Sequence, residues 1–169
     1  MKQTDNFKFD EANVMNELVY RNLSEDAKRQ ICAWKYGGEY DLYNLPAYEE
    51  MQVRQIGFMN PQREKNYYGF WDESILVGFV NILEEKEEVF IGIGVNPDLC
   101  NKHYGQRMLL ITYEISKKLY PDKPLYLEVR TWNIRAVKCY QKAGFRIDGQ
   151  AYELTTGIGT GTFYRMIRE

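Results

Sequence analysis

"VFIGIGVNPDLCNKHYGQRML" (residues 89–109) decides the fold, because it joins a strand pattern directly to a helix pattern. Its first seven residues are β-rich and apolar but include Gly92 and Gly94. Glycine weakens a strand and often marks a bulge or the close approach of another backbone or a ligand. A strand splayed here leaves the amides near Ile93 and Val95 without partners, and buried amides need partners. An extended ligand that contains amides can pair with them like an added strand.

A helical pattern begins near Tyr104, just after a proline turn. The first turn of a helix has free N–H groups and a partial positive charge, which makes it a natural seat for phosphate. Lys102 and Arg107 add cations, and Gly105 lets a bulky anion approach the backbone. Ordinary strand–loop–helix connections have the same features, so this stretch alone leaves both interpretations open.

The remaining pattern is typical of a mixed α+β fold around one sheet. Residues 1–17 are polar and predict an N-terminal arm, whereas residues 18–169 predict a single domain. Strands are expected over 18–22, 66–72, 75–85, 88–95, 124–130, 145–154 and 162–168. Helices are expected from Ser24 to a stop at 36–38, and over 47–58, 104–118 and 133–143. The glycine-rich stretch 155–162 predicts either a mobile loop or a hairpin turn.

Composition and charge narrow the class of protein. A net charge of −2 over 169 residues argues against bulk nucleic-acid binding, which needs a basic face. The three cysteines are scattered, with no pair at metal-ligand spacing, so we expect no metal and a reducing, cytoplasmic location. The N-terminal sequence lacks the apolar run of a signal peptide, and no stretch approaches the roughly 20 apolar residues of a membrane span. We therefore expect neither a nucleic-acid nor a membrane partner.

"YLEVRTWNIRAVKCYQKAGF" (residues 126–145), taken with the opening stretch, resembles the GCN5-related N-acetyltransferase (GNAT) family. Asn133, Ala136, Tyr140 and the Gly-Phe pair at 144–145 have the family's spacing, and the motif is most similar to ribosomal-protein N-terminal acetyltransferases. The resemblance implies a strongly twisted, mostly antiparallel sheet of about seven strands, splayed between strands 4 and 5 and flanked by about four helices. It also implies transfer of the acetyl group of acetyl-CoA to a primary amine by direct attack in a ternary complex.

The resemblance implies a cofactor site along the opening stretch. By this resemblance, Ile93 and Val95 would pair with the amides of pantetheine, and the Val95 amide would polarise the thioester oxygen. Asn133 is both a helix N-cap and a pantetheine partner, two roles that compete for one side chain. The loop that holds the pyrophosphate comprises Lys102, His103, Tyr104, Gly105, Gln106 and Arg107.

That loop departs from the family pattern Arg/Gln-x-x-Gly-x-Gly/Ala. Aligned on Gly105, the chain has Cys100 at the first position and His103 at the first glycine. Main-chain amides can still line the loop, since every non-proline residue has one. His103 must nevertheless fit where the family prefers no side chain.

Acetyl transfer to an amine needs a base and an acid, because a free alkyl amine has a pKa near ~10.4 and the leaving thiolate benefits from a proton. Strand alternation places Glu128 on the face opposite Leu127 and Val129, so Glu128 is the candidate base. Tyr140 shares a helix side with Asn133 and is the candidate acid. The alternatives are an exposed, paired Glu128 and a core tyrosine.

Aromatic residues crowd the stretch 33–51, where the family builds its acceptor site. We take Trp34, Tyr36, Tyr40 and Tyr43 as substrate-binding residues. The interleaved acids Glu39, Asp41, Glu49 and Glu50 favour a cationic acceptor. A small-molecule or peptide amine fits, whether polyamine, aminoglycoside, lysine or peptide N-terminus. Alternatively, the aromatic residues only pack the loop down. A homodimer is a further option.

Two other functions stay open. The altered phosphate loop is compatible with a non-catalytic acyl-CoA-binding sensor or interaction module of the same fold. A nucleotide- or phosphate-binding structural domain is disfavoured. Its phosphate loop would follow the first strand of a βαβ unit, whereas the loop over 100–105 follows a predicted antiparallel meander. A histidine-dependent nucleophile would have to use His103, the only histidine, and Cys139 is more typical of a small buried thiol than of an acetyl carrier.

Overall fold

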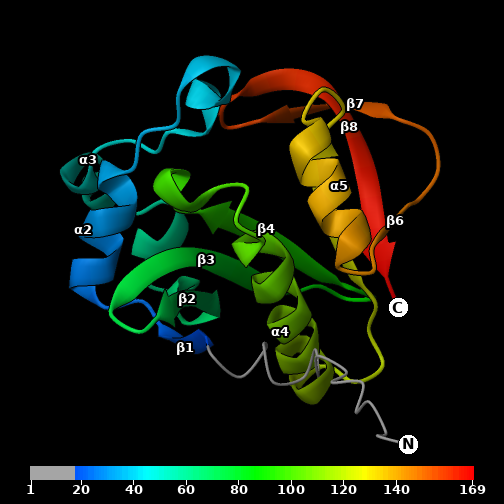
Figure 1. The fold of residues 1–169 in the computed structure, drawn as a ribbon, viewed down its shortest axis with the longest axis horizontal. Coiled ribbons are helices and arrows are strands. Elements are labelled where there is room, and N and C mark those ends of the chain that lie inside the picture. Colours follow the sequence, from blue (N-terminus) through cyan, green and yellow to red (C-terminus); the bar gives the residue numbers. More distant parts are fainter. Residues whose placement is uncertain (1–17) are drawn as a thin grey trace, which may run out of the picture.

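The computed structural model describes residues 18–169, so the predicted arm over 1–17 lies outside the described residues (Figure 1). These residues form one eight-stranded sheet in the order β1-β2-β3-β4-β5-β8-β6, with β7 paired to β8. The strands are β1 Leu18–Asn22, β2 Tyr67–Asp72, β3 Ile75–Glu84, β4 Val89–Val95, β5 Leu125–Arg130, β6 Arg146–Ile147, β7 Tyr152–Thr156 and β8 Gly159–Arg168. The α-helices are α2 Glu25–Ala33, α3 Tyr48–Arg54, α4 Tyr104–Leu119 and α5 Ile134–Lys142. Short 3-10 turns are η1 Gly38–Tyr43, η2 Gly57–Met59, η3 Glu64–Asn66 and η4 Pro97–Leu99.

The sheet opens between β4 and β5, as the sequence predicts. These two strands run parallel and pair only at Val89–Leu125 and Phe90–Tyr126, whereas every other strand pair of the described sheet is antiparallel. Beyond Phe90 the rest of β4 has no partner on its β5 side. The sheet is therefore joined at one end of this strand pair and open at the other.

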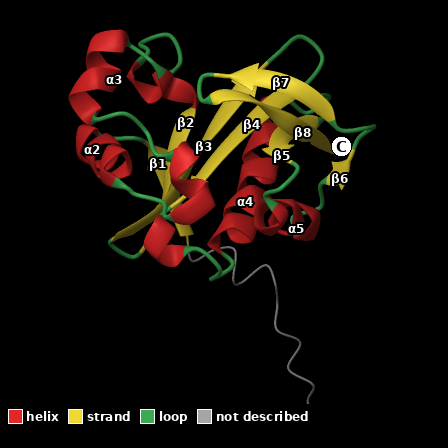
Figure 2. Ribbon diagram, turned by 90° about the horizontal axis from the view of Figure 1, so that it is seen from above, coloured by secondary structure: helices red, strands yellow, loops and turns green. Residues whose placement is uncertain are grey.

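Helices cover both faces of the sheet, and adjacent residues of one strand face different cores. Val77 packs with α4 and β5, whereas the neighbouring Leu76 packs with α2 and α3. This alternation is the period-two pattern of a strand buried on both faces. Seen from above, α2 and α3 lie beside the β1–β3 end of the sheet, whereas α4 and α5 lie beneath the strands nearer β5 and β8 (Figure 2).

Local capping and left-handed residues set the element boundaries. Ser24 caps α2 by accepting a hydrogen bond from the Ala27 amide at 3.2 Å, as predicted. The helix expected over 47–58 ends at Arg54, because Gln55 (φ 50°) and Gly57 (φ 56°) adopt left-handed conformations that a helix cannot continue through. The strand expected over 145–154 is divided into β6 and β7 at Gly149 (φ 78°).

The stretch 155–162 is a hairpin turn, because Thr156 pairs with Gly159 across it. None of the helices in residues 18–169 combines the length and the apolar character that a membrane span needs.

Candidate active site

A cavity of about 610 Å³ lies at the opening between β4 and β5. Its walls come from β4, β5, the start of α4, one side of α5 and the segment between α2 and α3. All predicted site residues line it except Lys102 and Arg107, namely Trp34, Tyr36, Tyr40, Tyr43, Ile93, Val95, His103, Tyr104, Gly105, Gln106, Glu128, Asn133 and Tyr140. Residues far apart in the sequence therefore meet at the predicted place.

The amides of Ile93 and Val95 face the opening. Val95 lies opposite Gly78 on β3, and the next amide, that of Asn96, donates to the Val77 carbonyl at 2.9 Å. Val95 is thus in a non-hydrogen-bonded pair, and its own N–H and C=O point away from β3. The same holds for Ile93, two residues earlier. Both N–H groups lie on the β5 side, where register pairing has ended.

The Tyr36 side chain joins the aromatic segment to this strand edge. Its hydroxyl donates to the Val95 carbonyl at 2.6 Å. Burial raises the pKa of the Tyr36 phenol well above its usual range, so the hydroxyl stays protonated and remains a donor. The predicted acceptor wall and the predicted thioester-binding residue are therefore in direct contact.

The loop before α4 has the backbone conformation that the family glycine would provide. Asn101 (φ 62°) and His103 (φ 64°) are both left-handed, and His103 is the N-cap residue of α4. Such alternation turns successive N–H groups toward one side and forms an anion-binding concavity. A side chain in this conformation costs roughly 1–2 kcal/mol relative to glycine. The positive φ of His103 therefore agrees with the glycine that the resemblance predicts at this position.

Gly105 lies where the first turn of α4 packs closely against α5. A Cβ atom added at this position would lie 3.0 Å from the Cys139 Sγ atom and 3.5 Å from a Val95 methyl carbon. The glycine therefore lets the first turn of α4 pack closely on α5 and β4, in addition to leaving its backbone at the cavity wall. Tyr104, the residue before it, donates a hydrogen bond from its hydroxyl to Asp72 at 2.5 Å, which ties this turn to β2.

The cations that line the cavity come mainly from α5. Lys102 is exposed outside the cavity wall, and the Arg107 guanidinium lies 5.2 Å from the Tyr104 ring centroid. Arg135, Lys138 and Lys142 line the cavity in their place. They lie on one side of α5 at positions i, i+3 and i+7, a spacing that could have identified them in the sequence.

Tyr140 is half-buried on α5 and lines the cavity. Burial, followed by the nearby Cys139 and Tyr43 side chains, raises the pKa of its phenol well above the usual range. Within residues 18–169, no group hydrogen-bonds its hydroxyl. The phenol is therefore a protonated and uncommitted donor at the cavity.

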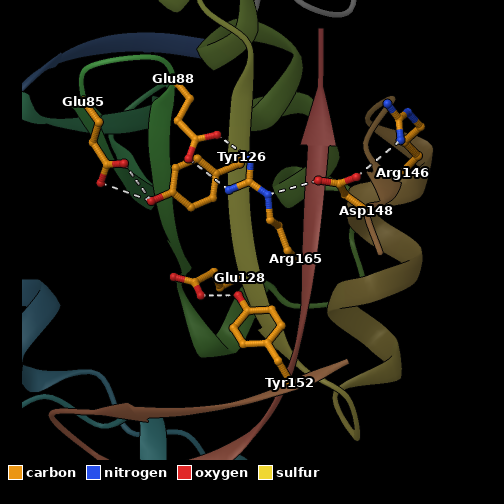
Figure 3. A network of polar contacts seen from close by, with 8 residues as sticks. All are labelled: Glu85, Glu88, Tyr126, Glu128, Arg146, Asp148, Tyr152 and Arg165. Atoms are coloured by element: carbon orange, nitrogen blue, oxygen red, sulfur yellow. Dashed lines mark hydrogen bonds and ion pairs between the residues drawn. The ribbon is translucent and has the colours of Figure 1, made fainter. Parts of the chain in front are cut away.

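Glu128 lines the cavity from β5, while Leu127 and Val129 on either side are buried in the core, as strand alternation predicts. Its Oε2 atom accepts a hydrogen bond from the Tyr152 hydroxyl of β7 (Figure 3). Tyr152 was missed by the sequence analysis, since only the pairing of β7, β8 and β5 brings it there. The pair leaves the second carboxylate oxygen of Glu128 without a hydrogen bond in the described part of the chain.

A polar network lies at the end of β4 and β5 where these two strands still pair (Figure 3). Arg165 on β8 pairs with Glu88, just before β4, and donates to Asp148 at 3.2 Å. Tyr126 on β5 donates to Glu85 at 3.0 Å, and its ring lies 4.3 Å beneath the Arg165 guanidinium. These contacts join β5 and β8 to the β3–β4 connection where the two parallel strands still pair.

The aromatic residues from the α2–α3 segment both line the cavity and pack the segment down. Tyr40 and Tyr43 contact Trp132, with ring centroids 5.6 and 6.1 Å apart, and the Arg135 guanidinium lies 4.0 Å from the Tyr40 ring centroid. Trp34 packs against Phe79 at 6.2 Å. These residues can therefore pack the loop and still line a substrate site, so the two interpretations are compatible.

Asn133 has the predicted capping role. Its Oδ1 atom accepts from the Ala136 amide at 3.2 Å, and its Nδ2 atom donates to the Tyr43 hydroxyl at 3.3 Å.

The acids expected to attract a cation do not line the cavity. Glu49 and Glu50 are exposed and pair with Arg29 at 3.7 Å and Arg54 at 2.9 Å. Glu39 and Asp41 are exposed outside the cavity lining as well, so its acidic wall consists of Glu128 alone among the described residues. The sequence places these acids next to the aromatic residues, but the 3-10 turn and α3 direct them to solvent.

Residues 18–169 contain no group of three or more His, Cys, Asp or Glu side chains arranged to hold a metal ion. The site is thus built from aromatic groups, backbone amides, one carboxylate and several cations.

Known structures share this fold. The spermidine N-acetyltransferase from Vibrio cholerae, in complex with CoA and spermine, aligns with a TM-score of 0.71 at 17% identity, over 90% of this chain and 95% of that chain. An acetyltransferase (GNAT family) from Bacillus anthracis aligns with a TM-score of 0.70 at 16% identity, over 90% and 94% of the two chains. No curated protein sequence matches significantly. At these identities the structural similarity establishes the fold alone.

The sequence profile of the acetyltransferase (GNAT) family matches residues 29–145, more than half of the chain. The chain therefore belongs to this family of acetyltransferases. The matched region contains β4, the start of α4, β5 and α5, which build most of the cavity. The resemblance identified from residues 126–145 is confirmed at the level of the family.

Proposed function

We propose that this protein is an acetyl-CoA-dependent N-acetyltransferase that acetylates a primary amine by direct attack in a ternary complex. The observation that carries the proposal is the open edge of β4, where the Ile93 and Val95 amides face a cavity. The same cavity holds a carboxylate, Glu128, and a protonated phenol, Tyr140. Binding groups, a base and an acid thus converge on one opening.

The residues present suit acetyl-CoA, which supplies an activated thioester. The Ile93 and Val95 amides would pair with its pantetheine arm, and the amides of residues 103–106 would hold its pyrophosphate at the start of α4. The Arg107 amide donates to the His103 carbonyl at 3.2 Å within the helix. Arg135, Lys138 and Lys142 add positive charge along the same wall. The side chains of Lys102 and Arg107 do not line the cavity.

In the reaction, Glu128 would take the proton from the acceptor ammonium, directly or through water, since only the neutral amine is a nucleophile. The Val95 amide would donate to the thioester oxygen as negative charge develops on it. Tyr140 would give its proton to the thiolate as the C–S bond breaks, and would recover a proton from water as the attacking nitrogen releases its second proton to solvent.

The acceptor subtype is a finer proposal. The motif around residues 126–145 is similar to ribosomal-protein N-terminal acetyltransferases, which favours a peptide amine. The similar Vibrio cholerae structures are of spermidine N-acetyltransferases, one of them dodecameric, which favours a small amine and self-association. We include both classes of acceptor in the test below. A single domain over 18–169, a homodimer and a cytoplasmic location stay predictions.

The test is a thiol-release assay with acetyl-CoA across a panel of amines, with mass spectrometry of the product. We expect release that depends on the amine, an N-acetylated product and intersecting initial-velocity lines, because direct transfer needs both substrates bound together. Parallel lines would indicate an acetyl-enzyme and contradict direct attack. Tight binding of acetyl-CoA in calorimetry without amine-dependent thiol release would support the sensor alternative.

A further inference from the structure

Arg130, the last residue of β5, is a buried arginine without an ionic partner. It is 8% exposed, and it lines the cavity. Its Nη2 atom donates to the Gly159 carbonyl at 3.4 Å, and its Cζ atom lies 5.0 Å from the Phe163 ring centroid. Its Nε atom is buried and makes no hydrogen bond, and no carboxylate of residues 18–169 lies within 4.0 Å of the guanidinium.

This lack of a partner sets Arg130 apart from other shielded cations of the chain. The buried Lys28 pairs with both Glu25 and Glu64, at 2.8 and 3.3 Å, and Arg165 pairs with Glu88 and Asp148. A buried charge is costly unless a counter-charge accompanies it. Since the protein supplies none to Arg130, an anionic ligand in the cavity is the natural counter-charge.

The sheet also makes room for this arginine. A Cβ atom added at Gly161 on β8 would lie 2.1 Å from the Arg130 Nη1 atom. Any other residue at position 161 would therefore displace the guanidinium. Gly161 therefore lets the Arg130 side chain lie against β8, but it offers the guanidinium no counter-charge.

Arg130 lies on the acceptor side of β5. Leu127 and Val129 pack into the core under α4 and α5, so Glu128 and Arg130 alternate to the opposite face. The cations suited to phosphate, Arg135, Lys138 and Lys142, belong to α5 instead. Arg130 is therefore separate from the wall that suits the pyrophosphate.

Glu128 and Arg130 are neighbours on one face of β5, with Cα atoms roughly 6–7 Å apart in an extended strand. They make no ion pair with each other within the described chain, although both line the cavity. We propose that the acceptor is an amine that also carries a carboxylate, with Arg130 holding the carboxylate while Glu128 faces the amine. The proposal rests on the proposed function and names its substrate class. An uncompensated guanidinium also repels a polycation such as spermidine.

The test compares amino acids with their primary amides as acceptors: glycine, β-alanine and 4-aminobutanoate, with spermidine as a polycation. For at least one pair, we expect kcat/KM to favour the acid over its amide by about 10- to 100-fold, the size of a charge-assisted hydrogen bond. Arg130→Gln should remove this preference, so that each acid and its amide are acetylated with kcat/KM values within about twofold of each other. Arg130→Lys should keep part of it, because lysine keeps the charge but loses the bidentate fork. Arg63→Gln, at an exposed arginine outside the cavity, is the matched control.

A binding measurement separates this proposal from the proposed function. Calorimetry of the CoA-bound protein with the same three acids should detect binding that Arg130→Gln weakens about 10-fold or more and that Arg63→Gln leaves unchanged. If amines are acetylated but acids and amides are equivalent in both assays, the carboxylate proposal is wrong and the acetyltransferase stands. If the acids bind through Arg130 but no amine is acetylated, the proposed function fails and the anion site stands. Loss of folding in Arg130→Gln, checked by melting temperature, would also contradict the reasoning, since the substitution removes an unpaired buried charge.

Discussion

Replacing Gly105 by alanine tests how closely α4 packs on α5. The new Cβ atom would lie 3.0 Å from the Cys139 Sγ atom, whereas non-bonded heavy atoms prefer about 3.5–4.0 Å. The contact is too short by about half an ångström or more, so the start of α4 or the Cys139 side chain has to move. Because the first turn of α4 offers the N–H groups proposed to hold the pyrophosphate, the displacement should also weaken CoA binding.

Two opposing terms set the magnitude. Overpacking a well-packed contact costs typically 1–3 kcal/mol, whereas alanine is favoured over glycine in a helix by up to ~1 kcal/mol. Gly105→Ala should therefore destabilise the fold by about 0–3 kcal/mol, a fall in Tm of up to roughly 12 °C for a chain of this size. Displacement of one backbone donor should raise the Kd for CoA by about 2- to 10-fold.

The decisive measurement is a double-mutant cycle with Cys139→Ala, followed by urea unfolding and by calorimetry with CoA. Cys139→Ala removes the Sγ atom, so in that background Gly105→Ala should cost nothing or become stabilising. We expect a favourable coupling of about 1–3 kcal/mol between the two substitutions. Equal costs of Gly105→Ala in both backgrounds would refute the close approach of the two helices.

Three further predictions concern tyrosines. Tyr140→Phe should lower kcat by about 10²–10⁴-fold, because the thiolate loses its proton donor, while Tyr113→Phe, whose hydroxyl donates to the Glu169 carbonyl outside the cavity lining, should not. Tyr152→Phe should lower kcat about 10-fold with little change in the KM for acetyl-CoA, because Glu128 loses the hydrogen bond that orients it. Ionisation of Tyr36 and Tyr140 in the unfolded chain should lower the stability measured by urea unfolding above pH ~10, by up to ~1.4 kcal/mol per pH unit for each phenol. Burial raises the pKa of both folded phenols, so above pH ~10 the unfolded chain releases protons that the folded chain keeps.

Each of these predictions has a contradicting result. Equal kcat values for Tyr140→Phe and Tyr113→Phe would show that Tyr140 is not the proton donor. A Tyr152→Phe variant that changes only the KM for acetyl-CoA would place that residue outside the reaction. Stability that does not fall between pH 10 and 12 would contradict the burial of the two phenols.

Patterns local in the sequence determined the family, the element order and the placement of the two proposed catalytic groups. The glycines of β4 indicated the opening, alternation placed Glu128 toward the cavity, and helix spacing placed Tyr140 beside it. These inferences succeed because strand and helix periods assign each side chain to a face without reference to distant residues. The spacing of Arg135, Lys138 and Lys142 carried the same kind of signal.

Only the tertiary structure decided which groups acquire partners. Tyr152 reaches Glu128 through the β5–β8–β7 pairing, and Tyr36 reaches the Val95 carbonyl from 59 residues away in the chain. The same pairing leaves Arg130 buried without a carboxylate. The turn η1 and the helix α3 leave the acids of the aromatic segment exposed to solvent. Hydrogen bonds and counter-charges depend on distances of a few ångströms between remote segments, and no local period encodes those distances.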